Sequence, residues 1–453
     1  MTALALALVT PWAAGIVLAL LDGRRRAVGW AAVAVLAANL VALVVVAAEV
    51  LPDGTVEATT GNWPAGVGIT LRADALGVLF AVLSSLALLA ATVHEVLDGV
   101  RERVFPAIVV LMAAGLTGVF MTGDLFNFYV FFELSMTAAY ILATYGGTRR
   151  ELGAALVFTA VNLLGTFIFV LSIAGLYHVT GTLDMSRAAA RVAEVDPNAA
   201  IMIAVGFFAA FCVKLGLFPF HFWLPTVYTG ARPAVAAILS GGLANIGAYG
   251  LLRFGGGLLP GELNLASKAL MAIGCASIIY GGVLAVSRRT SVEMLAYSAI
   301  GQVGYVLVAI GVGGKVGFAA AILYSVVNAF NKILLFLTVE MRGAIVGAVF
   351  ALGALSVAGV PPAAGFVGKL ELFRAAVDSP VLLALFVLGS ALSFVYVFQI
   401  YQFDFWRGER TGPLSGWPQQ SLVAVVALVV LAAGVWPEPL LALSQEAAEV
   451  LAR

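Results

Sequence analysis

The sequence predicts an all-α integral membrane protein with about 14 transmembrane helices, because long apolar stretches recur along its whole length. Of its 453 residues, 62% are hydrophobic and 11% are charged, and the mean hydropathy is +1.07. Soluble domains are about 45–50% apolar and about 25% charged. A chain this apolar needs the lipid bilayer as its solvent, so we expect a multi-pass protein without a soluble domain.

Charged residues, glycine and proline clusters, and polar runs set the boundaries of the predicted helices. These breaks divide the chain into spans over residues 2–21, 28–50, 73–97, 105–122, 125–145, 152–177, 200–228, 233–255, 265–286, 292–313, 316–340, 343–375, 380–402 and 420–442. Three arginines, Arg24 to Arg26, follow the first span. A signal peptide carries its basic residues before the apolar run, so this segment is interpreted as a transmembrane helix.

Composition excludes several function classes. The formal net charge is zero and there is no basic tract, so nucleic acid is not expected as a partner. Both cysteines, Cys212 and Cys275, lie inside apolar runs, which indicates neither a disulfide framework nor a metal site. The sequence has no nucleotide-binding loop, so we expect neither a cofactor nor a self-contained enzyme.

Basic residues predict the orientation of the helices, because they are enriched in cytoplasmic loops. Alternate loops carry 13 of the 24 lysines and arginines, whereas the other loops and the C-terminus carry eight. This bias places both termini outside the cell. The longest polar loop, 181–199, is interpreted either as a short helix at the membrane interface or as a plain linker.

Two predicted spans are unusually long and contain proline near their middle. Pro219 and Pro225 interrupt 200–228, and Pro361-Pro362 interrupts 343–375. Proline removes a helical hydrogen bond and clashes with the preceding turn. Backbone freed in this way is tolerated at membrane depth only where it faces protein or a hydrated cavity. A pair of interrupted helices therefore predicts a transporter site built from structural repeats.

Three lysines lie deep inside apolar spans: Lys214, Lys332 and Lys369. A charge at the bilayer centre costs about 2.5–3.5 kcal/mol on insertion scales, so three such residues in one chain predict a function. The alternatives are that each lysine only satisfies neighbouring polar groups, or that Lys369 extends toward the headgroups.

One carboxylic acid is equally deep. Glu133 lies between phenylalanines and a leucine within an apolar span. Burial disfavours its charged form and a nearby ammonium favours it, so Glu133 and Lys214 are predicted to be partners. A pair whose protonation depends on its geometry is suited to proton transfer.

Other polar side chains share these spans. His221 follows the first proline break, where an imidazole either transfers protons near neutral pH or is a structural group bonded to a tyrosine or carbonyl. Ser298, Gln302 and Asn328 are interpreted as supporting polar groups, because such side chains also hold transmembrane helices together.

Four motifs in the same order resemble those of the antiporter-like family found in respiratory complex I, membrane-bound hydrogenases and Mrp-type cation/proton antiporters. They are DLFNFYVFFEL (124–134), KLGLFPFHFWLP (214–225), MLAYSAIGQVGY (294–305) and GVPPAAGFVGK (359–369). The run LYHVTGTLDM (176–185) is similar to the D subunit of Mrp antiporters.

This resemblance implies 14 helices with two inverted five-helix repeats, broken at helices 7 and 12, in one domain over 1–453. The implied parts are N-terminal helices over about 1–100, repeats over about 104–255 and 265–402, and a C-terminal helix over about 420–442. It further implies that Glu133 and Lys214 form the essential pair, that Lys332 lies on a central axis, and that Lys369 leads to the exit. One departure is Asn245, which stands where many relatives carry a buried lysine, so a lysine-to-lysine transfer is not expected there.

The leading hypothesis is a proton-translocating subunit of a multi-subunit Na+/H+ antiporter in the prokaryotic plasma membrane. H+ and Na+ and the other antiporter subunits are its expected partners. The first alternative is a proton-pumping subunit of a redox complex of the complex I or hydrogenase type. The second is a structural membrane subunit whose buried charges only hold helices together.

Overall fold

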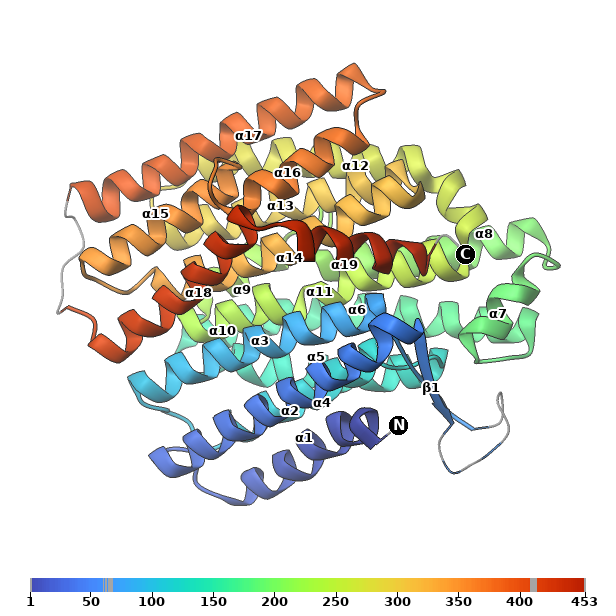
Figure 1. Cartoon of the computed structure of the whole chain (residues 1–453), viewed down its shortest axis with the longest axis horizontal. Helices are drawn as coiled ribbons and strands as arrows, with labels where there is room; N and C mark the ends of the chain where they lie inside the picture. The colour runs from blue at the N-terminus through green and yellow to red at the C-terminus, as the bar shows by residue number, and fades with distance from the viewer. Residues whose placement is uncertain (1, 60, 62, 64–67, 408–413, 452–453) are drawn as a thin grey trace.

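The computed structural model describes residues 2–59, 61, 63, 68–407 and 414–451, and in this part of the chain it is almost entirely helical. Most helices run side by side along the long axis of the molecule (Figure 1). The helices are α1 (Thr2–Leu20), α2 (Arg26–Asp53), α3 (Ala75–Asp98), α4 (Phe105–Phe120), α5 (Leu125–Ala143), α6 (Arg149–Thr180), α7 (Met185–Val192), α8 (Pro197–Leu215), α9 (Trp223–Gly230), α10 (Pro233–Ala237), α11 (Asn245–Gly250), α12 (Pro260–Ser287), α13 (Ser291–Val312), α14 (Gly314–Thr338), α15 (Ala344–Ala358), α16 (Ala364–Ala375), α17 (Pro380–Tyr401), α18 (Trp417–Val435) and α19 (Glu438–Glu449), with π-helical segments η2 (Ile238–Leu243), η3 (Leu251–Leu258) and η4 (Gln402–Trp406).

The predicted fold class is confirmed. Among the described residues, 12 helices are long and apolar enough to cross a membrane, and two shorter apolar helices, α4 and α15, accompany them. The exact number of 14 crossings, the inverted relation of the repeats and the orientation of the termini stay predictions. The polar loop 181–199 does contain a short helix, α7.

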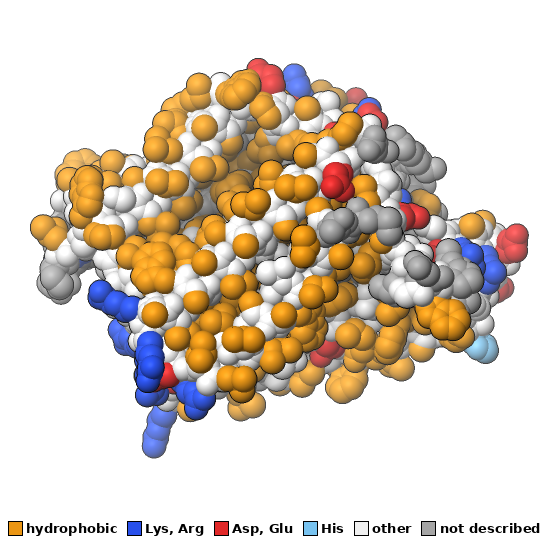
Figure 2. All heavy atoms as spheres, turned by 60° about the horizontal axis from the view of Figure 1, so that its bottom comes forward, with side chains coloured by type: hydrophobic (Ala, Val, Ile, Leu, Met, Phe, Trp, Pro, Cys, Tyr) orange, Lys and Arg blue, Asp and Glu red, His pale blue; other side chains and the backbone are white. Residues whose placement is uncertain are grey.

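The molecule has two distinct ends. One, here called the basic end, carries the loops with Arg24–Arg26, Arg101 and Arg232. The opposite end, called the hairpin end, carries the strands and both marked termini (Figure 1). Figure 2 shows a face dominated by hydrophobic side chains, with lysines and arginines gathered toward one side. This distribution is expected of a protein whose sides contact lipid or apolar partners.

Burial separates central helices from peripheral ones. In the most apolar stretch of Pro233–Leu258 and of Gly314–Thr338, 94% of the residues are buried, against 22% in Trp417–Val435. Segments α10–η3 and α14 therefore form the centre of the bundle, and charged groups on them are shielded from lipid by other helices.

Both predicted helix breaks are present. Helix α8 is followed by the capping residue Gly216 with a left-handed backbone (φ 66°), and α15 is capped by Gly359 in the same way (φ 82°). Glycine adopts this conformation without the steric penalty of a side chain. The chain resumes helical structure as α9 and α16. Each break leaves backbone groups free at membrane depth, where a charged side chain can use them.

The predicted span 233–255 is not one regular α-helix, because η2 and η3 widen it. Around η2 the packing is tight: a Cβ on Gly241 would lie 2.4 Å from Ile333, and one on Gly242 would lie 2.9 Å from Leu88. Glycine therefore lets this segment approach α14 and α3 closely. π-Helical turns are frequent at functional sites.

Two features differ from the sequence predictions. Strands β1 (Thr55–Thr59) and β2 (Thr70–Asp74) form an antiparallel hairpin in a loop that had no predicted structure. The C-terminal span predicted over 420–442 is wrong at its end, because α18 stops at Val435 and α19 starts at Glu438. Pro437 lies between them, and proline does not continue a helix.

Asp74 joins the hairpin to the helical bundle. It caps α3 by accepting the Gly77 N–H (3.0 Å), and its other contacts are Arg253 Nη2 at 2.6 Å and Arg72 Nε at 3.4 Å. Burial by itself would raise the pKa of Asp74, but the charge of Arg253 and the hydrogen bonds lower it overall. The carboxylate therefore stabilises the fold above its ordinary pKa, and this contribution is lost as the pH falls to the depressed value.

We expect Asp74→Asn to destabilise the protein by about 3 kcal/mol, because it leaves the buried Arg253 guanidinium without its counter-charge. The measurement is thermal aggregation of the protein in detergent. Asp378→Asn, in a loop, is the matched control and should leave the transition unchanged. An equally stable Asp74→Asn form would show that Arg253 needs no carboxylate.

Candidate functional site

Lys214 lies in the last turn of α8, directly before the helix break, and only 6% of it is exposed. Its Nζ donates to the Asn162 carbonyl at 3.0 Å and to Thr166 Oγ1 at 3.1 Å, both on α6. The ammonium also lies 4.5 Å from the centre of the Phe132 ring on α5. Neutral oxygens and an aromatic face thus hold this charge, instead of a carboxylate.

Glu133 is next to Phe132 on α5 and is half-buried. Its Oε1 is shielded from solvent and has no hydrogen-bond partner. The ion pairs found among the described residues do not include one between Glu133 and Lys214, so the two groups are not in direct contact in this conformation. The Glu133 charge still acts on Lys214 through space, and on the neighbouring Tyr129 and Tyr140 hydroxyls.

A narrow cavity separates these groups from the centre of the bundle. Phe132, Phe158, Lys214, Trp223 and Leu243 are among the residues that line it. Trp223 is fixed there because its indole N–H donates to the Val213 carbonyl at 2.9 Å. The cavity joins α5, α6 and both halves of the broken helix to the π-helical segment.

His221 lies in the break between α8 and α9. Its Nε2 is 2.8 Å from the Tyr280 hydroxyl on α12, and its Nδ1 is buried without a hydrogen-bond partner. The ring packs against Phe218 and Phe222. The tyrosine-bonded alternative is therefore correct for one nitrogen, while the other remains available for a proton or a water molecule.

Lys332 lies on α14, the central helix, with 7% of it exposed. It makes no hydrogen bond or ion pair with any described residue. Asn328, one turn earlier, faces the same side, and Asn331 has a buried Oδ1 without a partner. Unsatisfied polar atoms at this depth are stable only with water, so this region is suited to hold it.

Lys369 lies on α16, with 4% of it exposed, which excludes extension to the headgroups. Its Nζ donates to the Ala358 carbonyl at 3.1 Å, and it lies 5.3 Å from the centre of the Tyr305 ring. Ala358 is the last residue of α15. Lys369 therefore reaches back across the second break to backbone that the break set free.

Gln302 joins three helices beside Lys369. Its Nε2 donates to Ser393 Oγ at 3.1 Å and to the Tyr396 hydroxyl at 2.8 Å on α17, and its Oε1 accepts from Tyr324 on α14. Every polar atom of this amide is satisfied, as predicted for a group that holds helices together.

Ser298 and Asn245 each donate to a backbone carbonyl one turn earlier in the chain. Ser298 Oγ donates to the Leu295 carbonyl at 2.7 Å, and Asn245 Nδ2 donates to the Gly241 carbonyl at 2.7 Å. The structure thus places Lys214, on which the Glu133 charge acts, at one break and Lys369 at the other, with Lys332 on the central helix.

Sequence reasoning did not identify the groups that hold the lysines. Asn162 and Thr166 are one turn apart on α6, a spacing that was visible in the sequence. Nothing in the sequence singled out Tyr280, which contacts His221, or Tyr324 and Tyr396, which contact Gln302, because many tyrosines lie in apolar runs.

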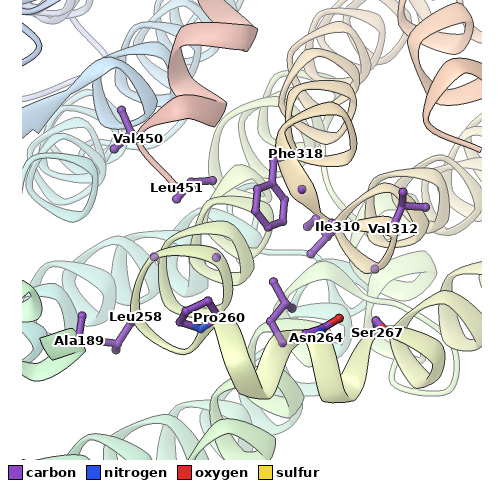
Figure 3. A pocket seen from close by; sticks show the side chains of 16 residues that line it. Ala189, Leu258, Pro260, Asn264, Ser267, Ile310, Val312, Phe318, Val450 and Leu451 are labelled. Carbon is purple, nitrogen blue, oxygen red and sulfur yellow. The ribbon is translucent and has the colours of Figure 1, made fainter. Parts of the chain in front are cut away.

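A separate cavity of about 570 Å³ opens at the hairpin end, between the start of α12 and the junction of α13 and α14 (Figure 3). Leu258, Pro260, Asn264, Phe318 and Leu451 are among its lining residues. The lining of this cavity includes no residue predicted to carry protons.

Comparison with known proteins gives consistent results. Residues 122–394 match the transmembrane family described as NADH:quinone oxidoreductase/Mrp antiporter. The chain is 30% identical over 395 residues to the D subunit of a Na(+)/H(+) antiporter from Alkalihalophilus pseudofirmus, covering 82% of this chain and 80% of that protein.

Two solved structures have the same fold. A chain of the Mrp complex from Dietzia sp. superposes with a TM-score of 0.92 at 26% identity, covering 100% of this chain and 98% of that one. A chain of respiratory complex I from Thermus thermophilus superposes with a TM-score of 0.86 at 23% identity, covering 99% of each. At that lower identity the second likeness shows the fold alone.

Proposed function

Because the chain belongs to the NADH:quinone oxidoreductase/Mrp antiporter transmembrane family, we propose that it is the proton-translocating subunit of a multi-subunit monovalent cation/proton antiporter. It acts in the prokaryotic plasma membrane beside the other antiporter subunits, and it exchanges H+ against Na+ together with them. The name of the 30% identical relative favours an antiporter over a redox complex.

The observation that carries the proposal is the state of the three deep lysines. All three are buried, and none of the ion pairs among the described residues involves any of them. A structural salt bridge would lower the cost of burial and would fix the charge. A lysine held by neutral oxygens is instead free to change its protonation state, since desolvation opposes the charged form.

The proposed path begins at the first break. Protons are exchanged at Lys214, with His221 in the same break, and the charge on Glu133 controls how tightly Lys214 holds its proton. The Phe132 ring lies at the ammonium, so a modest movement of α5 against α8 changes the separation of the two charges.

From Lys214 the proton passes through the narrow cavity to Lys332 on the central helix. Asn245, at the start of α11 directly after η2, cannot itself hold a proton, so this transfer uses water. Lys369 is the last carrier, and the hydrogen bonds of Gln302 hold α13, α14 and α17 together. The burial of each lysine and the neutral groups that Lys214 and Lys369 contact support this path.

Sodium is not expected to cross on these residues. A lone carboxylate such as Glu133 does not supply the several oxygen ligands that hard cations require. Coupling to sodium therefore needs the partner subunits.

The proposal is tested by purifying the complex through a tag on this chain and reconstituting it in liposomes. Addition of NaCl should move protons against an imposed pH gradient without any electron donor. If the chain instead co-purifies with iron–sulfur or quinone-binding subunits, and protons move only with an electron donor, the redox-complex alternative is correct.

A further inference from the structure

A second group of titratable residues, of which His94, Glu95 and Tyr145 are buried, lies at the basic end, away from the three lysines. It consists of His94, Glu95 and Asp98 in the last turns of α3, Tyr145 after α5, and Arg232 before α10, and is called the His94–Glu95 cluster. Segments from both halves of the chain meet there.

Glu95 is only 2% exposed, although it is one turn from the end of α3. Its Oε1 accepts a hydrogen bond from the Tyr145 hydroxyl at 2.5 Å, and that hydroxyl accepts the Arg101 backbone N–H at 2.9 Å. Glu95 forms no ion pair with a cation in the described part of the chain. It is therefore a carboxyl group held in place by a neutral donor.

Charged groups face the cluster from several elements. Arg232 Nη2 lies 3.4 Å from Asp98 Oδ2, and its guanidinium lies 5.8 Å from the centre of the Tyr145 ring. Asp98 is also 3.5 Å from Gln419 Nε2 on α18. Arg232 therefore forms its ion pair with Asp98 and not with Glu95. The charges of Asp98, Arg101 and Arg232 all act on Glu95 through space.

His94 is 8% exposed, and both of its ring nitrogens are buried without a hydrogen-bond partner. A neutral imidazole has one donor and one acceptor, and buried polar atoms almost always have partners, from protein or from ordered water. A core histidine with a purely structural role would bond to a carbonyl or side chain. Two imidazole nitrogens without a protein hydrogen-bond partner instead indicate a site that binds water.

The segments that form the cluster lead in two directions, to the loops at the basic end and to α14. Its outer side continues into the arginine-bearing loop after α3. Tyr228, four residues before Arg232, has a buried hydroxyl without a hydrogen-bond partner and packs on Phe336 with ring centres 5.5 Å apart. Lys332 is one turn before Phe336 on α14.

We propose that the His94–Glu95 cluster is the site where protons are exchanged between the water at the basic end and the Lys332 axis. A proton from water passes by way of both the Glu95 carboxylate and the His94 imidazole, and then by way of Tyr228 and bound water to Lys332. No bond other than O–H and N–H bonds forms or breaks. The inference rests on the proposed proton-translocating function and adds an entry that none of the three lysines supplies.

The test uses the complete complex in inside-out membrane vesicles, whose outer surface is the basic end in the predicted orientation. Vesicles loaded with NaCl are diluted into sodium-free buffer, so that outward Na+ flow draws protons in from the bulk, and a fluorescent dye reports acidification of the lumen. Glu95→Gln keeps an oxygen for the Tyr145 hydrogen bond, and His94→Asn keeps a polar side chain.

Both variants should slow acidification by at least about tenfold at alkaline pH, with a difference that shrinks at mildly acidic pH, because a proton-binding group matters most when protons are scarce. Glu102→Gln, in the following loop, and His178→Asn, on the exposed end of α6, are matched controls and should behave as wild type.

Wild-type rates in both cluster variants at every pH, or a loss that is the same at every pH, would overturn the inference and leave a structural role. Lys214→Ala in the same assay separates this result from failure of the proposed function. If Lys214→Ala is inactive while the cluster variants are normal, only the inference is wrong. If Lys214→Ala is also normal, the proposed function is wrong as well.

Discussion

Replacing Lys214 by alanine is expected to abolish proton-coupled sodium transport while the complex still assembles. Proton transfer through a positioned side chain is worth about 10²–10⁴-fold in rate, so the variant should lose at least about 100-fold. Lys214 is the only ionisable group among the described residues that line the narrow cavity. Its loss therefore interrupts the path, and no neighbour replaces it.

Assembly should survive because the energetic terms nearly cancel. The substitution removes two hydrogen bonds to Asn162 and Thr166, each worth about 1.5–3 kcal/mol when a charged group takes part. It also removes the burial of an ammonium, which costs about 2.5–3.5 kcal/mol at the bilayer centre. Blue-native electrophoresis of the complex measures this part of the prediction.

The matched control is Lys268→Ala, on the exposed face of α12. It makes the same chemical change on the molecular surface and should retain full transport. Unchanged sodium-driven proton movement in the Lys214→Ala complex would remove Lys214 from the mechanism, whereas a complex that fails to form would assign it a structural role.

Glu133→Gln is expected to lower transport by at least about tenfold without loss of protein, because a through-space charge at Lys214 is removed. The amide has almost the same shape as the carboxyl group, and Glu133 Oε1 makes no hydrogen bond that the substitution would break. Only the charge and the capacity to bind a proton change. The measurement is the initial rate of proton movement after NaCl addition across a range of pH.

Glu133→Asp keeps the charge and should recover part of the rate, and Glu194→Gln, in an exposed loop, is the matched control. Wild-type transport by Glu133→Gln would favour the structural-subunit alternative for this residue, since a charge that only held helices together would act on stability and not on rate.

The sequence alone supplied most of the fold, because the bilayer imposes a simple rule on it. A segment either has enough consecutive apolar residues to cross the bilayer or it does not. The apolar runs between the charged loops are long enough for nearly every helix. The breaks at Gly216 and Gly359 were predictable for a similar local reason, since the prolines beside them disrupt the helix wherever it lies.

The deep charges were equally visible, because a lysine or glutamate within an apolar run stands out in a sequence. The neutral groups that each charge contacts were not visible in the sequence, and Glu133 and Lys214 form no ion pair in the described part of the chain. The Lys214 partners come from α6, about 50 residues earlier in the chain. The distance between two side chains on different helices depends on helix rotation and packing, which apolar composition does not determine.

Tertiary structure alone decided the remaining features. The hairpin β1–β2 is fixed by Asp74 and by Arg253, a residue far along the chain. His94 looked unremarkable near a helix end, and only its packed surroundings show that both ring nitrogens lack partners. The sequence by itself determined which segments enter the membrane and which charges they carry, because burial in lipid depends on local composition. The fold decided which neutral groups surround each charge, because those groups are brought together only when distant helices pack.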